Sequence, residues 1–590
     1  MLEAIKDLGQ IVLKQEKKDR LSIFVENINN NGRYNTCLAI MLEDKNGEIK
    51  YSGVEEEPFD NLKTLKYLYR SASGNGPDFS PTAKLTEAKR TFNMKILGWF
   101  RILNSKRINI SKEGLEFLRK IRAVLKAKNE DIVKAIEGKR AQKPRKESIF
   151  LTLKFKSGLD EKYIGDYEVF RFLFSKNIDM KNLKIYGEEK VCSICKEKKP
   201  VVIGNLDTYK FYTIDKPGFI SGGFKEKDAW KNFPVCLDCK VALEEGKKYI
   251  QENLTFSFAG LKYQLIPKFL FGSSFAEDIV QLLEKIKINS LKKEQKNVYL
   301  ADEEEILGYI QDEKDNMSLN FLFIKQIQSA ERIQILLEDI FPSRIKGLFT
   351  AKEKVDKIFA GEENFTFWTL RTFFFKSDEK KRESDLDRYF FELTEKIFKN
   401  RKIDRSFLMA FFMKKIRNDF ISDDFFNSSV RRALMNIIFL SKLNLIEDKE
   451  EVMEDNLFDE LFEKYGLTFA SPLKRGLFLL GALAELLLRK QYKDREAKPF
   501  MKNLKSLKMD ERDFKGLLPK IQNKFEEYES FGKGKRIIAQ EASNYLLKAG
   551  DKWKMGLDEM NFYFACGMNL VEEVSKVVYK NKTDEEEKNE

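Results

Sequence analysis

Two pairs of cysteines are the residues in this chain whose type and spacing define a site. Cys192 and Cys195 lie in VCSICKEKKP, and Cys236 and Cys239 lie in FPVCLDCK, with forty residues between the pairs. Two residues between thiolates let a tight turn direct both sulfurs at one ion, and two such turns complete a tetrahedral shell. Because a shell of four cysteines leaves no open coordination position, the spacing predicts a structural Zn²⁺ that stabilises the fold. The alternative is a set of separate redox-active or buried thiols.

The absence of histidine from all 590 residues removes several catalytic mechanisms. Without histidine there is no Ser-His-Asp or Cys-His nucleophile, no His-dependent metal nuclease and no zinc finger with two cysteines and two histidines. The sequence also lacks a G-x-x-x-x-G-K-[ST] phosphate loop and a G-x-S-x-G elbow. We therefore predict that the protein is not an enzyme. A nuclease that uses carboxylates and Mg²⁺ is a further alternative, although no motif supports it.

The segment between the cysteine pairs, 209–234, combines glycines, aromatic side chains and lysines. Glycine lets the backbone approach a ligand closely, lysine neutralises phosphate, and aromatic rings stack on bases. We interpret the segment as a nucleic-acid surface; the alternative is a hairpin whose aromatic rings pack beneath the metal. The candidate contact residues are Lys216, Gly222, Gly223, Lys225, Lys227 and Lys231.

A second glycine-containing loop, YRSASGNGPDFSPTAK at 69–84, interrupts a helical pattern. Glycine and asparagine at its centre, including Asn75, favour tight turns, and Arg70 and Lys84 flank them. Both a binding loop and an ordinary structural loop fit this pattern.

The overall charge favours an anionic partner. Lysine and arginine exceed aspartate and glutamate by 13 in the chain, and nucleic acid is the usual partner of a large basic protein. Lysine-rich solvated faces give the same total. The acidic residues in the first twenty positions and the short apolar run at 476–488 predict neither a signal peptide nor a membrane span. Six cysteines, four of them paired, suit a reducing compartment, so we expect a cytoplasmic protein.

The periodicity of apolar residues predicts an α+β fold. A mixed α/β N-terminal region carries an inserted, zinc-ribbon-like module with the four cysteines, and an all-α helical bundle follows it. A helix is expected at about 2–17, strands at 21–28, 35–44 and 48–54, and helices across 61–70 and 112–138. Further strands are expected at 149–155, 254–258, 262–266 and 317–326, and nearly everything from 331 onward is expected to be helical. The expected domains are 1–147 (mixed α/β), 148–330 (β-rich, with the four-cysteine module at about 187–250), 331–452 (helical connection) and 453–590 (helical bundle).

Basic residues are in excess in the last helical region. Residues 498–555 contain 14 Lys and Arg against 8 Asp and Glu, a surplus of six. These side chains either line a path for a nucleic-acid strand or form an ordinary solvated helical face. The candidates for the path are Arg475, Lys520, Lys524, Lys533, Lys535 and Arg536.

Several motifs together resemble a known family. They are CSICKEKKPVV, FYTIDKPGFISGGFKEKDAWKNFPVCLDCKVALEEGKKYI, YLYRSASGNGPDFSPTAKLT and SPLKRGLFLLGALAELLLRKQY. They are similar to the large subunit of the type I-B CRISPR effector complex (Cascade), of the Csh type. The resemblance extends from the N-terminal third to the C-terminal helices, and the cysteine module is its most specific part.

This resemblance implies a non-catalytic subunit of an RNA-guided complex in antiviral defence. Such a subunit recognises the protospacer-adjacent motif (PAM) on target double-stranded DNA, helps to open and stabilise the R-loop, and recruits a helicase-nuclease in trans. The implied partners are a guide crRNA and the backbone and handle-binding Cascade subunits. With this family in mind, we expect the Gly222–Gly223 turn and Lys225 to approach the PAM duplex. Arg70, Asn75 and Lys84 would serve the guide handle or a neighbouring subunit.

The resemblance also concerns the C-terminal bundle, which is similar to the small helical subunit of the complex. That subunit can be translated from a start codon inside the large-subunit gene. Met453 opens a helical unit here, and the preceding Lys449 and Glu450 are compatible with the codons AAG GAG of a ribosome-binding sequence. The sequence AAA GAA in the gene would count against an internal start.

A different class of function stays open beside this one. A free-standing zinc-ribbon protein that binds nucleic acid, such as a transcription or repair factor, would show the same cysteine spacing and basic charge. A co-purifying short RNA would separate the two.

Overall fold

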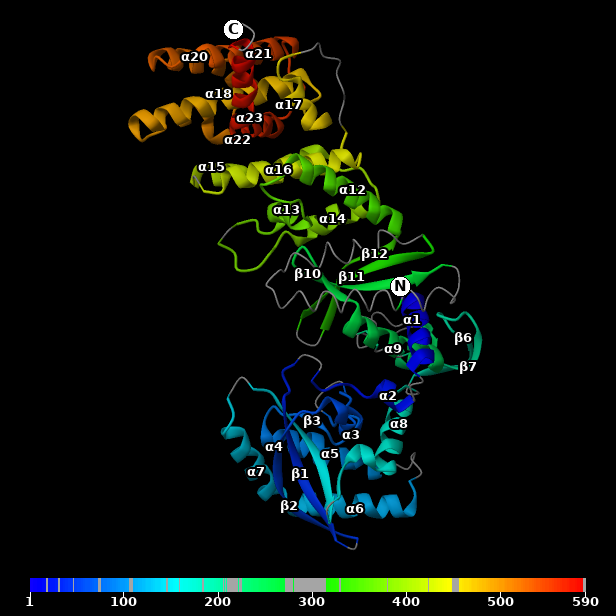
Figure 1. Ribbon diagram of the computed structural model, residues 1–590. Helices are drawn as coiled ribbons and strands as arrows, with labels where there is room; N and C mark the ends of the chain where they lie inside the picture. The colour runs from blue at the N-terminus through cyan, green and yellow to red at the C-terminus, as the bar shows by residue number, and fades with distance from the viewer. Residues whose placement is uncertain are drawn as a thin grey trace. The chain divides into compact units, whose positions relative to one another are not determined.

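The computed structural model in Figure 1 describes most of the 590-residue chain. The described residues are 1–16, 20–29, 32–45, 47–72, 76–104, 110–144, 147–158, 160–182, 185–204, 206, 208–209, 221, 225–270, 280, 315–327, 330–378, 380–422, 424–447 and 456–586.

The chain forms two compact units, which we describe separately. Unit 1 comprises residues 1–252 with 326–331, and unit 2 comprises residues 253–325 with 332–590. These limits differ from the expected domain ends at 147 and 330. Strand β1 pairs with β4 across the first of those ends, and the second falls at the start of strand β12.

Unit 1 contains a five-stranded sheet in the order β2-β1-β4-β3, with β5 paired to β4. Alternate residues of β1 enter two different cores, as the two-residue period of a strand requires. Leu38, Ile40 and Leu42 pack with the helices, whereas Cys37 and Ala39 face a smaller core. The elements are α1 (Leu2–Glu16), α2 (Arg20–Phe24), β1 (Thr36–Lys45), β2 (Glu48–Pro58), η1 (Asn61–Lys63), α3 (Thr64–Tyr67), β3 (Ala83–Lys84), α4 (Ala88–Thr91), η2 (Phe92–Ile96), α5 (Leu97–Trp99), η3 (Phe100–Asn104), α6 (Lys112–Ala127), α7 (Asn129–Ala141), β4 (Ile149–Ser157), β5 (Asp160–Tyr163), η4 (Ile164–Asp166) and α8 (Glu168–Asn182).

The rest of unit 1 is the module that carries the cysteines. Its three-stranded sheet has the order β6-β7-β8, and a 17-residue helix follows β8 directly. The elements are β6 (Tyr186–Val191), β7 (Lys198–Ile203), η7 (Glu226–Lys231), β8 (Val235–Cys236) and α9 (Leu237–Asn253).

Unit 2 begins with a four-stranded sheet in the order β12-β11-β10-β9. Aromatic rings from this sheet pack against the first helices of the unit; the ring centroids of Phe258 and Phe367 are 4.7 Å apart. The elements are β9 (Thr255–Phe258), β10 (Leu261–Phe269), β11 (Met317–Ile327), β12 (Ala330–Ile340), α12 (Pro342–Ile358), α13 (Phe367–Arg371), η8 (Thr372–Phe374), α14 (Asp387–Phe398), α15 (Arg405–Ser422), α16 (Phe426–Lys442), α17 (Asp459–Lys464), η9 (Gly466–Phe469), α18 (Pro472–Arg495), η10 (Pro499–Leu507), α19 (Glu511–Lys515), α20 (Leu517–Glu527), α21 (Lys533–Lys548), α22 (Leu557–Asn569) and α23 (Val571–Glu586).

Two glycines let the longest helix, α18, cross α22 at backbone contact. A methyl group added at Gly481 would overlap the carbonyl oxygen of Phe564, and one added at Gly567 would overlap that of Phe478. The contact is therefore reciprocal, and it places these two helices at the centre of the helical region. Most residues of α18 from 472 to 488 are buried, which explains the apolar run at 476–488.

The expected fold class is confirmed: the N-terminal half is mixed α/β with a four-cysteine cluster, and the C-terminal region is mainly helical. Two local predictions are wrong. Residues 21–24 of the segment expected as a strand belong to helix α2, and residues 331–340 belong to strand β12 where helix was expected, because β12 pairs with β11 in the sheet of unit 2. Among the described residues, no helix is both long and apolar enough to span a membrane.

Candidate metal centre

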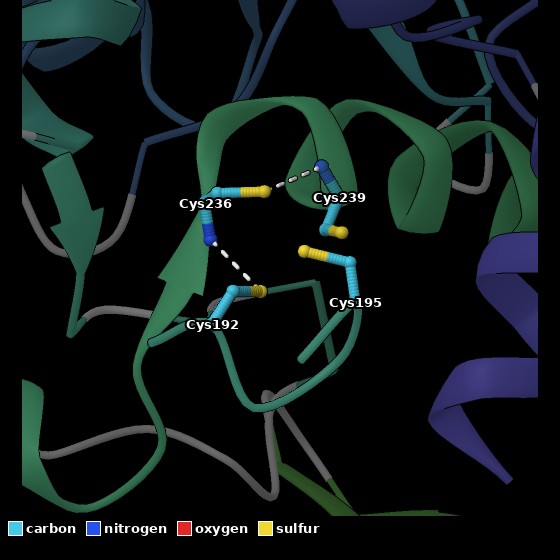
Figure 2. A group of neighbouring side chains, drawn as sticks. All are labelled: Cys192, Cys195, Cys236 and Cys239. Carbon is cyan, nitrogen blue, oxygen red and sulfur yellow. Dashed lines mark hydrogen bonds between the residues drawn. The ribbon is translucent and has the colours of Figure 1, made fainter. Parts of the chain in front are cut away.

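Four cysteine side chains from two distant segments meet in unit 1 (Figure 2). Cys192 and Cys195 lie in the turn between β6 and β7, Cys236 ends β8, and Cys239 lies in the first turn of α9. The four Sγ atoms all lie within 4.8 Å of one another. Three of the side chains are buried, and Cys195 is half-buried. The predicted pairing of the two Cys-x-x-Cys motifs in one cluster is confirmed.

Backbone N–H groups hold the sulfurs in place before any ion binds. The N–H of Cys236 lies 3.3 Å from the Cys192 sulfur, and the N–H of Cys239 lies 3.4 Å from the Cys236 sulfur (Figure 2). In the first turn, the N–H of Cys192 donates to the Glu197 carbonyl at 2.9 Å, and Lys196 adopts a left-handed φ of 61°. These bonds stabilise thiolate character and fix the direction of each sulfur.

The electrostatics of the cluster favour a thiolate at one position. Hydrogen bonds from Cys239 lower the pKa of Cys236 to about 5. Burial raises the pKa of the half-buried Cys195. Burial opposes the charge of Lys6 in α1, but a hydrogen bond to Asp7 and the negative charges of Asp7 and of the cysteine cluster raise its pKa. A positive side chain from the N-terminal helix therefore lies near the cluster.

The lysines that follow the first cysteine pair along the chain are already engaged. Lys196 pairs with Glu3 at 3.1 Å, and Lys199 pairs with Glu197 at 2.6 Å. Lys240, next to Cys239, is 2% exposed. Lys199 interacts electrostatically with Cys195 and Cys236, and such an ammonium charge reduces the net negative charge of the cluster.

Helix α9, which supplies Cys239, is fixed by a close crossing with α1. A methyl group at Gly246 would overlap the carbonyl oxygen of Ile5, and one at Gly9 would overlap that of Ala242. Because neither glycine has a side chain, the two backbones touch. The N-terminal helix is thereby held against the cysteine module, as Figure 1 shows for α1 and α9.

The donor set fits a metal ion. Four sulfurs at this separation, supported by N–H groups and by nearby ammonium charges, match the four-thiolate shell of a structural site. All four donors come from the protein, so the shell has no position for a reacting water. A metal ion bound by these four sulfurs would connect the β6–β7 turn to β8 and α9.

A lysine-containing 3₁₀-helix, η7, lies before β8 and is anchored by one tryptophan. The indole of Trp230 in η7 packs on Gly187 of β6, where an added methyl group would lie 2.8 Å from the ring, and the backbone of Trp230 packs on Gly204 after β7. Lys190 and Lys231 lie 5.7 and 5.8 Å from the centre of the indole. Tryptophan thus fixes η7 to the sheet of the cysteine module.

Three of the candidate lysines are on this segment. Lys225 and Lys227 are exposed, and neither has an ion pair within the described ranges. Lys231 is also exposed and pairs with Asp228 at 3.3 Å. Lys216, Gly222 and Gly223 lie outside the described residues.

The loop at 69–84 has its basic side chains inside unit 1. Arg70 is 9% exposed, donates to the Phe24 carbonyl at 3.1 Å and lies 3.5 Å from the Glu244 carboxylate. Lys84 is half-buried, 4.6 Å from the centre of the Tyr34 ring. Arg70 therefore links this loop to α2 and α9, and Asn75 lies outside the described residues.

The bundle candidates fall into two groups. Arg475 is 8% exposed; it donates to the Phe469 carbonyl at 2.9 Å and pairs with Asp459 at 2.5 Å, so it holds α17 and α18 together. The others lie in or next to α20 and α21, where Lys524 and Arg536 pair with glutamates and Lys535 stacks on Phe525. Exposed members of the set are Lys520, Lys533 and Arg536. Met453 lies outside the described residues.

Sequence reasoning missed two contributions to the site. Lys6 lies 186 positions before Cys192 in the sequence. It comes close to the cysteine cluster only because α1 crosses α9. Trp230 was part of the quoted motif, but its role depends on glycines at 187 and 204.

Three domain models of a single protein family match the chain in order. They are described as the N-terminal, central and C-terminal domains of CRISPR-associated protein TM1802, and they match residues 1–176, 189–340 and 365–582. All four cysteines lie within the central match. No curated protein matches the chain.

Proposed function

Because the chain belongs to the family of CRISPR-associated protein TM1802, we propose that it is the non-catalytic large subunit of a type I-B RNA-guided effector complex (Cascade). Membership of the family implies a role in CRISPR defence. The observation that carries the proposal is the match of all three domains in order, which leaves only short segments of the chain unmatched.

In this proposal, the cysteine cluster binds Zn²⁺, and the metal has a structural role. Thiolates are preferred ligands of zinc, and a closed four-thiolate shell leaves catalysis to another protein. The ion would hold the β6–β7 turn, β8 and α9 together, and with them the 3₁₀-helix η7. The absence of histidine and of a phosphate loop supports a subunit that recruits a separate helicase-nuclease in trans.

Two exposed lysines, Lys225 just before η7 and Lys227 within it, are the proposed contact with target DNA. Lys225 and Lys227 lie on a segment that Trp230 fixes to the metal module, so their position relative to the rest of the module is set. Exposed lysines held in fixed positions suit binding of a duplex backbone next to the PAM. Sequence recognition beyond the PAM would come from base pairing with the guide RNA. We leave Arg70 and Arg475 out of the proposed surfaces because their guanidinium groups have internal partners.

The experiment that tests the function is purification of the tagged protein from its native gene cluster. We expect it to bring down short RNAs with a constant 5′ repeat sequence, together with other subunits of the complex. If neither RNA nor partner proteins co-purify while the neighbouring genes are expressed, the chain is a free-standing zinc-ribbon protein and the proposal fails.

A further inference from the structure

Three consecutive residues of unit 2 have left-handed backbone conformations although none of them is glycine. Lys505, Ser506 and Leu507 have φ values of 45°, 52° and 59°. They end the 3₁₀-helix η10. In an L-residue this conformation brings Cβ close to the following carbonyl oxygen, so non-glycine residues adopt it singly and rarely in a run. A run of three persists only where the surroundings enforce it.

Side chains of helices α15 and α22 hold this turn in its left-handed conformation. Arg417 of α15 donates from Nε to the Leu507 carbonyl at 2.8 Å and pairs with Asp558 of α22 at 2.6 Å. The side-chain amide of Asn561, also in α22, donates to the Met509 carbonyl at 2.8 Å and accepts from the Met509 N–H at 3.1 Å. The turn is also held by three buried side chains, those of Leu504, Leu507 and Met509.

The outer side of the same turn is cationic. Residues 498–508 contain four lysines and no aspartate or glutamate. Lys502, Lys505 and Lys508 are exposed, and the N–H of Lys508 donates to the Lys505 carbonyl at 3.1 Å, which keeps the last two on one turn. Lys505 pairs with Asp513 at 2.5 Å. For Lys502 and Lys508, the described part of the chain offers no ion pair.

We propose that this lysine turn, residues 502–508, is a binding site for the phosphate backbone of a nucleic acid. The inference rests on the proposed function and adds to it a specific site in the C-terminal region. Flexible lysines on a mobile loop lose side-chain and backbone freedom on binding, whereas a turn clamped by Arg417 and Asn561 presents its ammonium groups already positioned. Lys502 and Lys508 can each neutralise a phosphate without first breaking an internal ion pair.

The lysine turn differs from the path expected along α20 and α21. There, Lys524 and Arg536 pair with glutamates, and the positive charge is partly neutralised. Residues 502–508, by contrast, include three lysines and no acidic residue, and among the residues that the structure describes only Lys505 of the three has an ion-pair partner, Asp513.

The test uses the full-length protein and a fluorescently labelled oligonucleotide of about 30 nucleotides, offered both as a single strand and as a duplex. Affinity is measured by fluorescence anisotropy over a range of NaCl concentrations. We expect K502E/K508E to weaken binding about tenfold at low salt. We also expect the slope of log affinity against log salt to fall by about 0.7 (single strand) or 0.9 (duplex) for each phosphate that the variant no longer neutralises.

The matched control is K354E/K357E on α12, which reverses two exposed lysines in the same unit. The two double variants change the net charge equally. If binding occurs at the lysine turn, only K502E/K508E should lose affinity. The variant K502R/K508R should bind as the wild type does. If K502E/K508E loses more affinity for the single strand than for the duplex, the turn contacts single-stranded nucleic acid; the reverse result indicates duplex.

Equal losses in K502E/K508E and K354E/K357E would overturn the inference, because general charge would then explain binding. Failure of the wild-type protein to bind either oligonucleotide would overturn it as well. Neither result bears on whether guide RNA co-purifies, so failure of the site can be distinguished from failure of the proposed function.

Discussion

Individual cysteines in the metal cluster depend on different surroundings. Cys236 receives its hydrogen bonds from Cys239, whereas Cys192 accepts from the N–H of Cys236. The Cys192 sulfur is therefore tied to the opposite pair and the Cys236 sulfur to the first turn of α9, so removing Cys236 disturbs the position of Cys192. Outside the cluster, Cys37 and Cys566 are fully buried core residues, as the apolar segments around them predict.

The substitution Cys236→Ser should abolish metal binding and destabilise unit 1. Structural Zn²⁺ contributes on the order of 10 kcal/mol to small domains, and each kcal/mol of lower stability reduces the melting temperature of a unit this size by about 2–4 °C. Metal content by mass spectrometry and thermal unfolding check the prediction. Cys566→Ala is the control, since it removes a buried thiol outside the cluster and should leave the metal content unchanged. Full metal occupancy in Cys236→Ser would contradict a four-thiolate site.

The substitution Lys225→Glu should weaken binding of target duplex by the purified complex and leave guide loading intact. A lysine that contacts a phosphate contributes uniformly across sequences, so the slope of log affinity against log salt should fall by about 1. Lys134→Glu on α7 is the control, because this lysine is also exposed and lies far along the chain from the cysteine module. If both variants bind the duplex as the wild type does, η7 has only a structural role.

At the scale of elements, paired glycines decide which helices touch. The α1–α9 crossing uses Gly9 and Gly246, and the α18–α22 crossing uses Gly481 and Gly567. In each case the glycine of one helix faces a carbonyl of the other, so the backbones approach without a side chain between them. The first crossing positions a metal ligand, and the second forms the centre of the helical region.

The substitution Gly481→Ala should destabilise the protein although alanine is the better helix former. The added methyl group would overlap the Phe564 carbonyl, and overpacking against a rigid neighbour costs about 1–3 kcal/mol. Gly347→Ala in α12 is the control: no atom lies within 4 Å of the added methyl group, and it should gain up to about 1 kcal/mol from helix propensity. Urea unfolding of both variants checks the opposite signs, and equal stabilisation would contradict the close crossing.

At the scale of the whole molecule, the C-terminal bundle of unit 2 is continuous with the helices before it. Helix α22 contacts α15 and α16 as well as α18. Arg405 of α15 lies 3.2 Å from Glu559 and 3.0 Å from the Tyr563 hydroxyl of α22. Asn569 at the end of α22 donates to the Asn427 carbonyl in α16 at 3.0 Å. The bundle expected from residue 453 onward therefore shares a packed interface with residues 405–442.

A product translated from Met453 would lack α15 and α16 and so would expose the side of α22 that they cover. We expect the isolated fragment 453–590 to bind a hydrophobic dye and to self-associate, because an apolar face of this kind needs a partner. Dye fluorescence and sedimentation measure both properties against the full-length chain. A monomeric fragment that binds no dye would show that the bundle rearranges when α15 and α16 are absent.

The sequence by itself determined the local features of this protein. Apolar periodicity predicted helix α1, strands β1, β2 and β4, and the long helices of unit 2, because spacing alone shows which residues share a face. The Cys-x-x-Cys spacing predicted the four-thiolate cluster because each pair is a local turn. The prediction failed where pairing with another strand decides the structure: residues 331–340 form strand β12 because the preceding strand β11 lies beside them.

Only the tertiary structure decided which charges are available. Arg70 and Arg475 have the same chemistry as any exposed arginine, but Glu244, far away in the sequence from Arg70, and Asp459 of the neighbouring helix α17 occupy their guanidinium groups. Conversely, Lys502 and Lys508 stand out only once the turn that carries them is seen to be clamped by Arg417 and Asn561. Whether a side chain is buried or paired depends on contacts with other segments, and those contacts exist only in the folded chain.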